Sequence, residues 1–255
     1  MNCDVLIPVR LGNSRLPGKA LKKINGKEVI LYLVERLKLC KNIRNVIICT
    51  TSLPSDDTLV DLLINKKIDF FRGSEKDILN RFLEASEKYK TDIIINVDGD
   101  DIYTDPLYVD QMAQDFVNTN VDYIDMIGFP FGFRSVGFSK NALKKICELK
   151  DTNNTETGYR DYFTTVDIFK IFNMHYNYIE FPKDIRLSLD YEEDLQLAKI
   201  IFNKLGNNFH LSDIIELFKN NPELLKITSN LEEKWEQHYK NNLTNFSLKK
   251  NDKNE

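Results

Sequence analysis

Three cationic side chains lie close together on a short loop near the start of the sequence. Arg10, Arg15 and Lys19 fall within LIPVRLGNSRLPGKAL, residues 6–21, which also contains glycine and proline. Like charges this close repel one another unless an anion usually lies among them. Small residues let backbone N–H groups approach phosphate oxygens, whose charge the cations neutralise. The loop therefore predicts a triphosphate site, and a solvated basic loop is the alternative.

The spacing of this loop differs from that of a P-loop ATPase. The P-loop motif has four residues between its glycines and a Ser or Thr after its lysine. Here five residues separate Gly12 from Gly18, and Ala20 follows Lys19. The sequence therefore disfavours a Walker-type ATPase.

A second group of chemically active side chains follows the apolar run DIIINV, residues 92–97. Asp98, Asp100 and Asp101 stand where this predicted strand ends, which is where open α/β sheets bind their ligands. Carboxylates this close destabilise one another's charge, and a hard divalent cation would relieve that repulsion. A simple turn rich in Asp and Gly is the alternative.

A third group lies in RLSLDYEEDL. Arg186, Ser188 and Asp190 share one face of a predicted strand because side chains alternate along it. Asp190 ends that strand and is the better candidate for a ligand. We expect the acids of the following helical turn to be structural, as is common at helix starts: Glu192, Glu193 and Asp194.

Histidine and cysteine offer little for catalysis. No histidine has a carboxylate or cysteine partner at metal-binding spacing, and we expect all of them to be non-catalytic: His175, His210 and His238. The cysteines show no paired metal spacing and are predicted to be small buried hydrophobic residues: Cys3, Cys40, Cys49 and Cys147. Neither a Gly-x-Ser-x-Gly elbow nor a Cys–His pair supports a covalent mechanism.

The elements that must position these groups alternate along the first half of the chain. Continuous apolar runs predict strands covered on both faces, at 3–9, 45–51, 69–73 and 92–100. Helical periodicity predicts intervening helices at 28–39, 57–65 and 76–89, with Ser55 as the N-cap of the second. This order predicts an α/β fold with a doubly wound, mainly parallel sheet.

The second half predicts further helices, two short strands and a tail. Helices are expected at 105–120, 141–149, 192–205, 211–226 and 230–242, strands at 176–181 and 185–191, and a disordered tail at 247–255. We expect one domain over residues 1–246. Within it, 1–125 mainly bind nucleotide, 126–205 form the acceptor and metal side, and 206–246 form the C-terminal helices.

The composition is that of a soluble globular protein. The 255 residues are 42% hydrophobic and 29% charged, with a formal net charge of −4, so a general nucleic-acid surface is not expected. No apolar run is long enough to span a bilayer. The chain does not open with a secretory leader, and we expect it to be cytoplasmic.

The motifs around these groups resemble those of one enzyme family. The loop IPVRLGNSRLPGKAL is similar to the nucleotide loop of the CTP-dependent cytidylyltransferases, which include CMP-Kdo synthetases, acylneuraminate-type enzymes and SpsF-like proteins. The resemblance continues through TTSLPSDD, FRGSEKDILNRF, VDGDDIYTDP, RLSLDYEEDL and NPELLK, over most of residues 1–226. It implies a Rossmann-like fold of the nucleotide-diphospho-sugar-transferase type, and a homodimer.

The resemblance also implies roles for individual residues. Arg10, Arg15 and Lys19 would hold the triphosphate, and Asp100 and Asp190 would hold Mg²⁺. The catalytic set it implies is Lys19, Arg10, Asp100 and Asp190. The nucleotide-binding set is Pro8, Arg10, Gly12, Asn13, Arg15, Lys19, Arg72, Gly73, Ser74 and Asp98.

The acceptor side departs from the family pattern. CMP-Kdo synthetases have Gln-Gly-Asp-Glu-Pro where this chain has residues 98–102, and KDTNNTETGYRDYFTT, residues 150–165, replaces their HIGIYAYR segment. This segment looks more like the branch that contains phosphonate cytidylyltransferases. Residues 150–165 are too polar to be expected in the core. We therefore expect them to line the acceptor side of the cleft, with a mobile surface loop as the alternative. The predicted acceptor-binding residues are Arg134, Lys150, Tyr159, Arg160 and Arg186.

The predicted function is therefore Mg²⁺-dependent transfer of CMP from CTP to an acidic acceptor, a sugar acid or a phosphonate, with release of pyrophosphate. The expected partners are CTP and that small acceptor, without nucleic acid or membrane. Two alternatives are a nucleotidyltransferase that uses a sugar phosphate and another NTP, and a degenerate nucleotide-binding regulatory protein.

Overall fold

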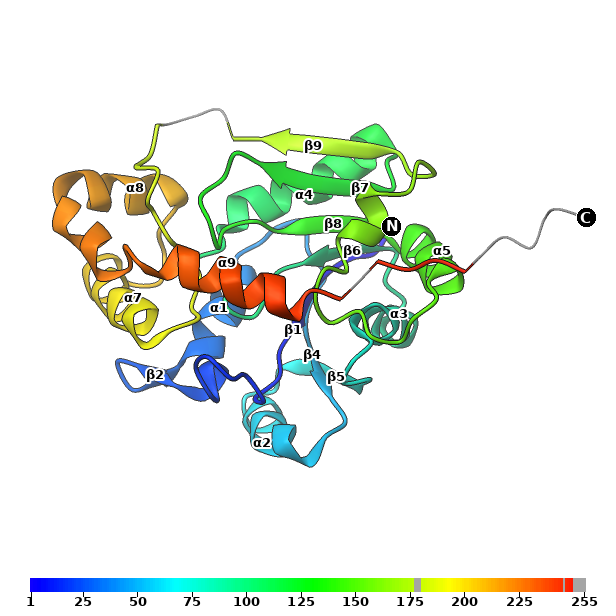
Figure 1. The fold of residues 1–255 in the computed structure, drawn as a ribbon, viewed down its shortest axis with the longest axis horizontal. Helices are drawn as coiled ribbons and strands as arrows, with labels where there is room; N and C mark the ends of the chain where they lie inside the picture. The colour runs from blue at the N-terminus through cyan, green and yellow to red at the C-terminus, as the bar shows by residue number, and fades with distance from the viewer. Residues whose placement is uncertain (177–179, 245, 250–255) are drawn as a thin grey trace, which may run out of the picture.

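A seven-stranded sheet forms the centre of the computed structural model, which describes residues 1–176, 180–244 and 246–249 (Figure 1). The strand order is β5-β4-β1-β6-β8-β7-β9. The strands are β1 Cys3–Pro8, β4 Asn45–Thr51, β5 Asp69–Gly73, β6 Ile93–Asn96, β7 Tyr123–Ile127, β8 Val136–Ser139 and β9 Ile171–His175. The strands β5, β4, β1 and β6 are parallel, β7 and β9 are parallel to each other, and β8 is antiparallel to both of its neighbours. A short hairpin, β2 Lys23–Ile24 and β3 Lys27–Glu28, lies apart from this sheet.

Helices cover both faces of the sheet, which confirms the predicted doubly wound α/β fold. Val5 and Ile7 of β1 join a core with α1 Val29–Leu37, α4 Pro106–Thr119, α7 Glu192–Leu205 and α8 Leu211–Asn220. Leu6, between them, joins a second core with α3 Ile78–Tyr89 and α5 Lys140–Leu149. Alternating side chains of one strand thus pack into two separate cores. The other helices are α2 Asp57–Asn65, α6 Asp161–Thr164 and α9 Leu231–Asn242, with 3-10 turns η1 Lys19–Leu21, η2 Pro54–Asp56 and η3 Pro222–Ile227.

The loops that follow the parallel strands meet at one edge of the sheet. The strands β1, β4, β5 and β6 end at Pro8, Thr51, Gly73 and Asn96. Asn96 also pairs with Val136, the first residue of β8, so the connection 128–135 between β7 and β8 reaches the same edge. All three predicted groups of polar residues therefore lie on segments that converge there.

The predicted strands of the acceptor half are partly wrong. Residues 185–191 are extended, but they form only one isolated bridge among the described residues, from Arg186 to Phe131. The predicted strand at 176–181 falls in part on 177–179, outside the described residues, and β9 precedes it. The strands β7 and β8 were not predicted.

The C-terminal region also differs from the prediction. The helix expected at 211–226 divides into α8 and η3, because Pro222 lacks an N–H and restricts the residue before it. The predicted disordered tail is wrong for residues 247–249, since Leu248 bridges Lys150; residues 250–255 lie outside the described part. Among the described residues no helix is long and apolar enough to cross a membrane.

Gly132 fixes how the extended segment meets the connection between β7 and β8. Its φ is +78°, and a Cβ atom there would lie 2.2 Å from the Ser188 backbone nitrogen. Beside it, the Leu187 N–H donates to the Phe131 carbonyl oxygen at 2.8 Å. Only glycine permits both the backbone conformation and this close approach.

We predict that Gly132→Ala lowers the free energy of unfolding by about 3 kcal/mol, because a left-handed conformation and a backbone clash are both penalised. Gly26→Ala is the matched control: its φ is +82°, but no atom lies within 4 Å of the added Cβ. We expect the free energy of unfolding of the control to fall by about 1 kcal/mol. Urea unfolding measures both variants, and equal losses would show that the close approach to Ser188 is unimportant.

Candidate active site

A lysine from the opening loop joins two carboxylates that lie far apart in the sequence. The Lys19 ammonium contacts Asp100 Oδ2 and lies 3.0 Å from Asp190 Oδ1. Arg15 Nη2 lies 2.5 Å from the same Asp190 oxygen. The fold therefore brings together the two acids predicted to hold metal and two of the three predicted loop cations.

Asp190 is buried and surrounded by donors. Its second oxygen, Oδ2, lies 3.0 Å from Arg186 Nη2 and accepts a hydrogen bond from the Ser188 hydroxyl at 3.0 Å. Arg186 in turn donates through Nε to Asp194 Oδ1 at 2.9 Å, and Asp194 Oδ2 accepts the Asp190 backbone N–H at 2.8 Å. Arg186, predicted to bind acceptor, thus lies in a buried ion network that orients Asp190. Among the three acids after Tyr191, Asp194 is the one that caps α7.

The cations and carboxylates of this cluster shift one another's pKa values. Burial alone would raise the pKa of Asp190, but Lys19, Arg15 and Arg186 hold it well below its usual range. Burial would lower the pKa of Lys19, and the carboxylates of Asp100 and Asp190 raise it above its usual value instead. The pKa of Asp100 is raised, because burial and the charges of Asp190 and Asp98 together outweigh the attraction of Lys19. Asp190 is thus an anion at neutral pH, and Asp100 is the less stabilised carboxylate.

Glu156, which was not predicted, provides the anionic partner of Arg10. Arg10 Nε lies 3.4 Å from Glu156 Oε1, and the buried Arg81 has its Nη2 at 3.1 Å from Oε2. Arg81 also donates through Nη1 to the Ser74 carbonyl oxygen at 2.7 Å. The opening loop and the Gly73–Ser74 turn are therefore connected through one carboxylate.

The segment 150–165 is far more buried than its polarity predicted. Thr155, Tyr159, Tyr162 and Phe163 are all buried, which corrects the expectation that the segment is excluded from the core. Lys150, predicted to bind acceptor, is also buried and forms an ion pair with Asp77. Its charge is neutralised inside the protein, because a buried ammonium needs an anionic partner.

The two remaining predicted acceptor cations are more open. Arg160 Nη2 lies 2.9 Å from Asp98 Oδ2 and donates to the Arg134 carbonyl oxygen at 3.3 Å. Arg134 forms a two-armed ion pair with Asp125, and its side chain stays 47% exposed. Tyr159 donates its hydroxyl hydrogen to Asn96 Oδ1 at the end of β6. Arg134 and Arg160 are thus neighbours at the edge where the strands end.

Short-range contacts give the opening loop its shape. Asn13 Oδ1 accepts the backbone N–H groups of Arg15 at 3.0 Å and Leu16 at 3.3 Å. Gly18, with φ of +64°, donates to the Leu11 carbonyl oxygen at 3.3 Å. These turns aim Arg15 and Lys19 toward the acids instead of toward solvent.

Comparison with known proteins decides the family. A family model described as Cytidylyltransferase matches residues 5–233. The chain belongs to the cytidylyltransferase family. It is accordingly a nucleotidyltransferase, an enzyme of the class that transfers CMP from CTP to an acceptor.

Individual relatives agree with this family. The chain is 28% identical to the spore coat polysaccharide biosynthesis protein SpsF of Bacillus subtilis, over 86% of this chain and 94% of that one. It is 31% identical to an uncharacterized protein of Methanocaldococcus jannaschii, over 90% and 95%. A 3-deoxy-manno-octulosonate cytidylyltransferase of Colwellia psychrerythraea is 31% identical over 64% of this chain and 58% of its own length.

Solved structures show the same fold. A cytidylyltransferase from Leptospira borgpetersenii superposes with a TM-score of 0.80 at 27% identity, covering 88% of this chain and 97% of that one. A CMP:2-keto-3-deoxy-manno-octonic acid synthetase, solved with CTP, gives a TM-score of 0.62 at 17% identity over 80% and 99%. The predicted fold type is confirmed.

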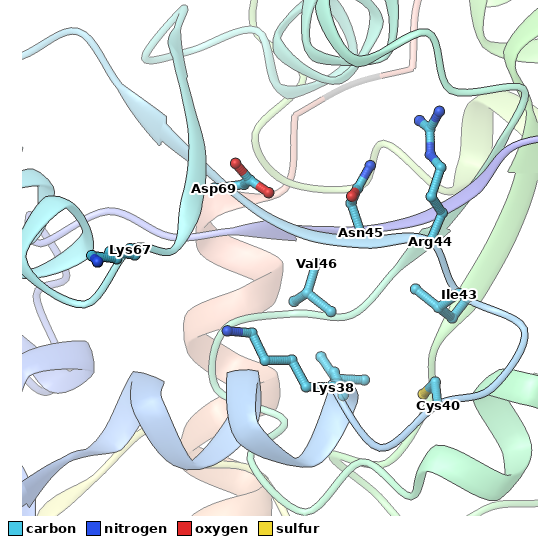
Figure 2. A pocket seen from close by; sticks show the side chains of 9 residues that line it. Lys38, Cys40, Ile43, Arg44, Asn45, Val46, Lys67 and Asp69 are labelled. Carbon is cyan, nitrogen blue, oxygen red and sulfur yellow. The ribbon is translucent and has the colours of Figure 1, made fainter.

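A cavity elsewhere in this cytidylyltransferase contains none of the predicted site residues. It has a volume of about 180 Å³ and is lined by Leu37, Lys38, Cys40, Ile43, Arg44, Asn45, Val46, Lys67 and Asp69 (Figure 2). Asn45 and Asp69 begin β4 and β5, so this cavity lies at the amino ends of the strands. Its Arg44 is already paired with Asp4, at 2.5 Å between Arg44 Nη2 and Asp4 Oδ2. The predicted site residues lie at the opposite edge of the sheet.

Arg72, predicted to bind nucleotide, and Asp56 hold the loop after β4. Arg72 donates through Nε to the Thr51 carbonyl oxygen at 2.9 Å and through Nη2 to that of Leu53 at 2.8 Å. Asp56 Oδ1 accepts the Leu11 backbone N–H at 2.8 Å, and its Oδ2 accepts the Thr50 hydroxyl at 3.0 Å. Asp56, not the predicted Ser55, is the N-cap residue of α2, and its side chain makes no cap bond. It supports the base of the nucleotide loop.

We predict that Asp56→Asn lowers the free energy of unfolding by about 1.5–3 kcal/mol at pH 7, since hydrogen bonds to a charged acceptor are lost. Burial raises the pKa of Asp56, but bonds from Thr51, Leu11 and Thr50 bring it below its usual value. The ionised carboxylate therefore stabilises the fold above about pH 4, and this contribution disappears as pH falls through the lower folded-state pKa. Urea unfolding should show that the difference in free energy of unfolding between variant and wild type becomes smaller below about pH 4.

The control for this prediction is Asp61→Asn, an exposed acid on the same helix α2. It should match the wild type at every pH. If the difference in free energy of unfolding between Asp56→Asn and wild type is unchanged or larger at acid pH, the proposed role of the Asp56 charge is contradicted.

Proposed function

We propose that this cytidylyltransferase is Mg²⁺-dependent and transfers CMP to an acidic acceptor. The observation that supports this most is the Lys19 ammonium held between Asp100 and Asp190. This contact brings a candidate phosphate-binding cation and two carboxylates of the type that binds metal ions close together at the sheet edge. Phosphoryl-type transfer depends mainly on positioning and charge neutralisation, which such a cluster supplies.

The proposed reaction is a single displacement. An oxygen of the acceptor attacks the α-phosphorus of CTP; the new oxygen–phosphorus bond forms as the bond to the β-phosphate oxygen breaks, and pyrophosphate leaves. Arg10, Arg15 and Lys19 stabilise the charge on the departing pyrophosphate. A carboxylate or phosphonate is already ionised near pH 7 and needs no general base.

The placement of His210 agrees with a reaction that uses no histidine. Its Nδ1 lies 3.0 Å from Asp105 Oδ1, and Asp105 caps α4 by accepting the Leu107 backbone N–H at 3.0 Å. His175 ends β9 and His238 lies on α9. These positions favour structural roles over proton transfer.

The donors present fit a magnesium ion. Among the described residues no group of three or more metal-type side chains gathers in one place. Mg²⁺ in nucleotide enzymes commonly uses one or two carboxylates together with substrate phosphates. Asp100 and Asp190 would hold it, and Asp100 keeps 23% of its side chain exposed. When bound, the ion supplies positive charge that lowers the repulsion between an anionic acceptor and the triphosphate.

The pairing of each loop cation strengthens the case for a metal. Arg10 faces Glu156, Arg15 faces Asp190, and Lys19 faces Asp100 and Asp190. The mutual repulsion expected among the cations is thus relieved by the protein's own acids. A triphosphate entering this cluster also meets carboxylates, and its binding needs compensating positive charge.

The names of the relatives support a sugar-acid acceptor. The Colwellia protein is named for 3-deoxy-manno-octulosonate, and the Bacillus protein for spore coat polysaccharide biosynthesis. Arg134 and Arg160 carry planar donor groups that suit a carboxylate or phosphonate, which would replace Asp125 and Asp98 as their partners. We propose an acceptor of this acidic class for the present chain.

The central test is pyrophosphate release with each of the four NTPs and a panel of sugar acids, phosphonates and sugar phosphates. We expect CTP to be the nucleotide used and an acid to be the acceptor. Preference for another NTP with a sugar phosphate would establish the alternative enzyme. Absence of turnover with every pair would favour a regulatory nucleotide-binding protein.

We predict that Lys19→Ala lowers kcat/KM for CTP about ten- to hundredfold, because a charge-assisted contact to phosphate is lost. Lys22→Ala removes a nearby cation that pairs with Glu192 and touches neither Asp100 nor Asp190. This control should keep wild-type kinetics. Matching constants for both variants would refute the triphosphate assignment of Lys19.

We predict that Asp100→Asn reduces turnover about hundredfold and weakens Mg²⁺-dependent CTP binding, since an amide lacks the charge that a hard cation requires. Isothermal titration of CTP with and without Mg²⁺ measures binding separately from turnover. Asp61→Asn on α2 is the exposed control. A variant at Asp100 that keeps its Mg²⁺-supported activity would show that this residue is not a ligand.

A further inference from the structure

The helix α9 spans two parts of the molecule and is attached mainly at its ends. It runs from the side of α7 and α8 toward the side of α5 (Figure 1). Leu231, at its first position, is the one residue of this helix that is fully buried, and every residue of the helix is described. Just past its last turn, the Thr244 hydroxyl donates to the Thr157 carbonyl oxygen. Between these two attachments the helix packs only through partly buried side chains.

Two aromatic side chains occupy that middle part. The rings of Trp235 and Tyr239 stack with centroids 5.0 Å apart and planes at 14°. The Trp235 ring meets the Phe131 ring at 4.7 Å and 76°. Both α9 residues are only partly buried. The two rings therefore keep part of their surface accessible to a ligand.

This aromatic pair lies close to the active site through Phe131. The Arg186 guanidinium carbon lies 4.8 Å from the centroid of the Phe131 ring, and Arg186 Nη2 lies 3.0 Å from Asp190 Oδ2. Two side chains, Phe131 and Arg186, therefore separate Trp235 from the proposed metal carboxylate.

Tyr239 is also within electrostatic range of the open acceptor cations. Burial and Asp161 raise the pKa of Tyr239, while Arg160 and Arg134 oppose that rise. Arg160 and Arg134 contact each other through the Arg134 carbonyl oxygen at 3.3 Å. The charges of these two guanidinium groups therefore reach Tyr239.

We propose that Trp235 and Tyr239 of α9 bind the ring of a sugar-acid acceptor, while Arg134 and Arg160 meet its anionic group. The positive C–H edges of a sugar ring are attracted to the negative face of an aromatic ring. Binding sites commonly combine such apolar surfaces with a few fixed polar groups. This proposal rests on the proposed CMP transfer and selects, within its acidic acceptors, those that contain a ring.

The test compares acceptors and α9 variants in CTP-dependent pyrophosphate release. The acceptors are 3-deoxy-manno-octulosonate, N-acetylneuraminate and the ringless phosphonoacetate. We expect a sugar acid to be the better substrate, and Trp235→Leu and Tyr239→Leu each to raise its KM about tenfold with the KM for CTP within about twofold of wild type. Trp235→Phe should recover part of the loss, because it keeps a ring.

Two controls accompany these variants. Glu232→Gln changes an exposed residue of the same helix and should leave every constant unchanged. Trp235 is the single tryptophan of the chain, so its fluorescence reports on α9 directly. In the wild type, adding the sugar acid to enzyme and CMP should change this emission, and phosphonoacetate should not.

The outcomes separate the two proposals. If CTP-dependent turnover is intact but the acceptor KM stays within about twofold of wild type in both leucine variants, α9 does not recognise the acceptor. Equal rises in the KM values for CTP and acceptor, or a preference for phosphonoacetate, also overturn this inference and leave CMP transfer standing. Failure of CTP to support release with any acid refutes the proposed function itself.

Discussion

The contact of one lysine with two carboxylates determines how the edge of the sheet is assembled. Lys19 lies on the loop after β1, Asp100 on the loop after β6, and Asp190 at the end of an extended segment outside the sheet. A buried carboxylate such as Asp190 is strongly destabilising unless cations and hydrogen-bond donors surround it. Each of the three segments therefore needs the other two in place, and the loop conformations are set by charge as much as by apolar packing.

This arrangement also explains the composition of the opening loop. Its cations do not need a bound anion to relieve their mutual repulsion. Acids from distant segments already neutralise them, as Glu156 does for Arg10 and Asp190 for Arg15. The predicted nucleotide site is therefore already organised by ion pairs within the protein. Under the proposed function, phosphate oxygens that enter the site would replace carboxylate oxygens as partners of the same guanidinium and ammonium groups.

The first half of the fold was readable from sequence because its signals are local. The strands 45–51 and 69–73 have the bounds predicted for them, since burial on both faces leaves continuous apolar runs. The structure of the acceptor half could not be predicted in this way, because it depends on contacts between residues that are far apart in the sequence. Lys150 looks like a surface lysine until Asp77, on another segment, pairs with it. Asp56 looks like an ordinary helix-start acid, yet its carboxylate accepts the Leu11 N–H.

Some candidate site residues could likewise be recognised from the sequence, and others only from the structure. Lys19, Asp100 and Asp190 were recognisable by residue type and by their places at predicted strand ends, and the structure brings them together. The aromatic pair of α9 had no such signal, because a Trp and a Tyr four positions apart on an amphipathic helix read as core residues. The structure shows instead that Trp235 contacts Phe131 and that both α9 side chains are partly exposed to solvent.

Residues 156–160 combine three attachments in one stretch of backbone. Glu156 holds Arg10, the Thr157 carbonyl oxygen holds the end of α9 through Thr244, and Arg160 holds Asp98. For protein engineering this makes the stretch a poor place to graft sequences from relatives, since any exchange disturbs the partners of Arg10, Asp98 and α9 at once. Under the proposed acceptor role of α9, substitutions on its exposed face would change the acceptor side and leave Glu156 and its partner Arg10 in place.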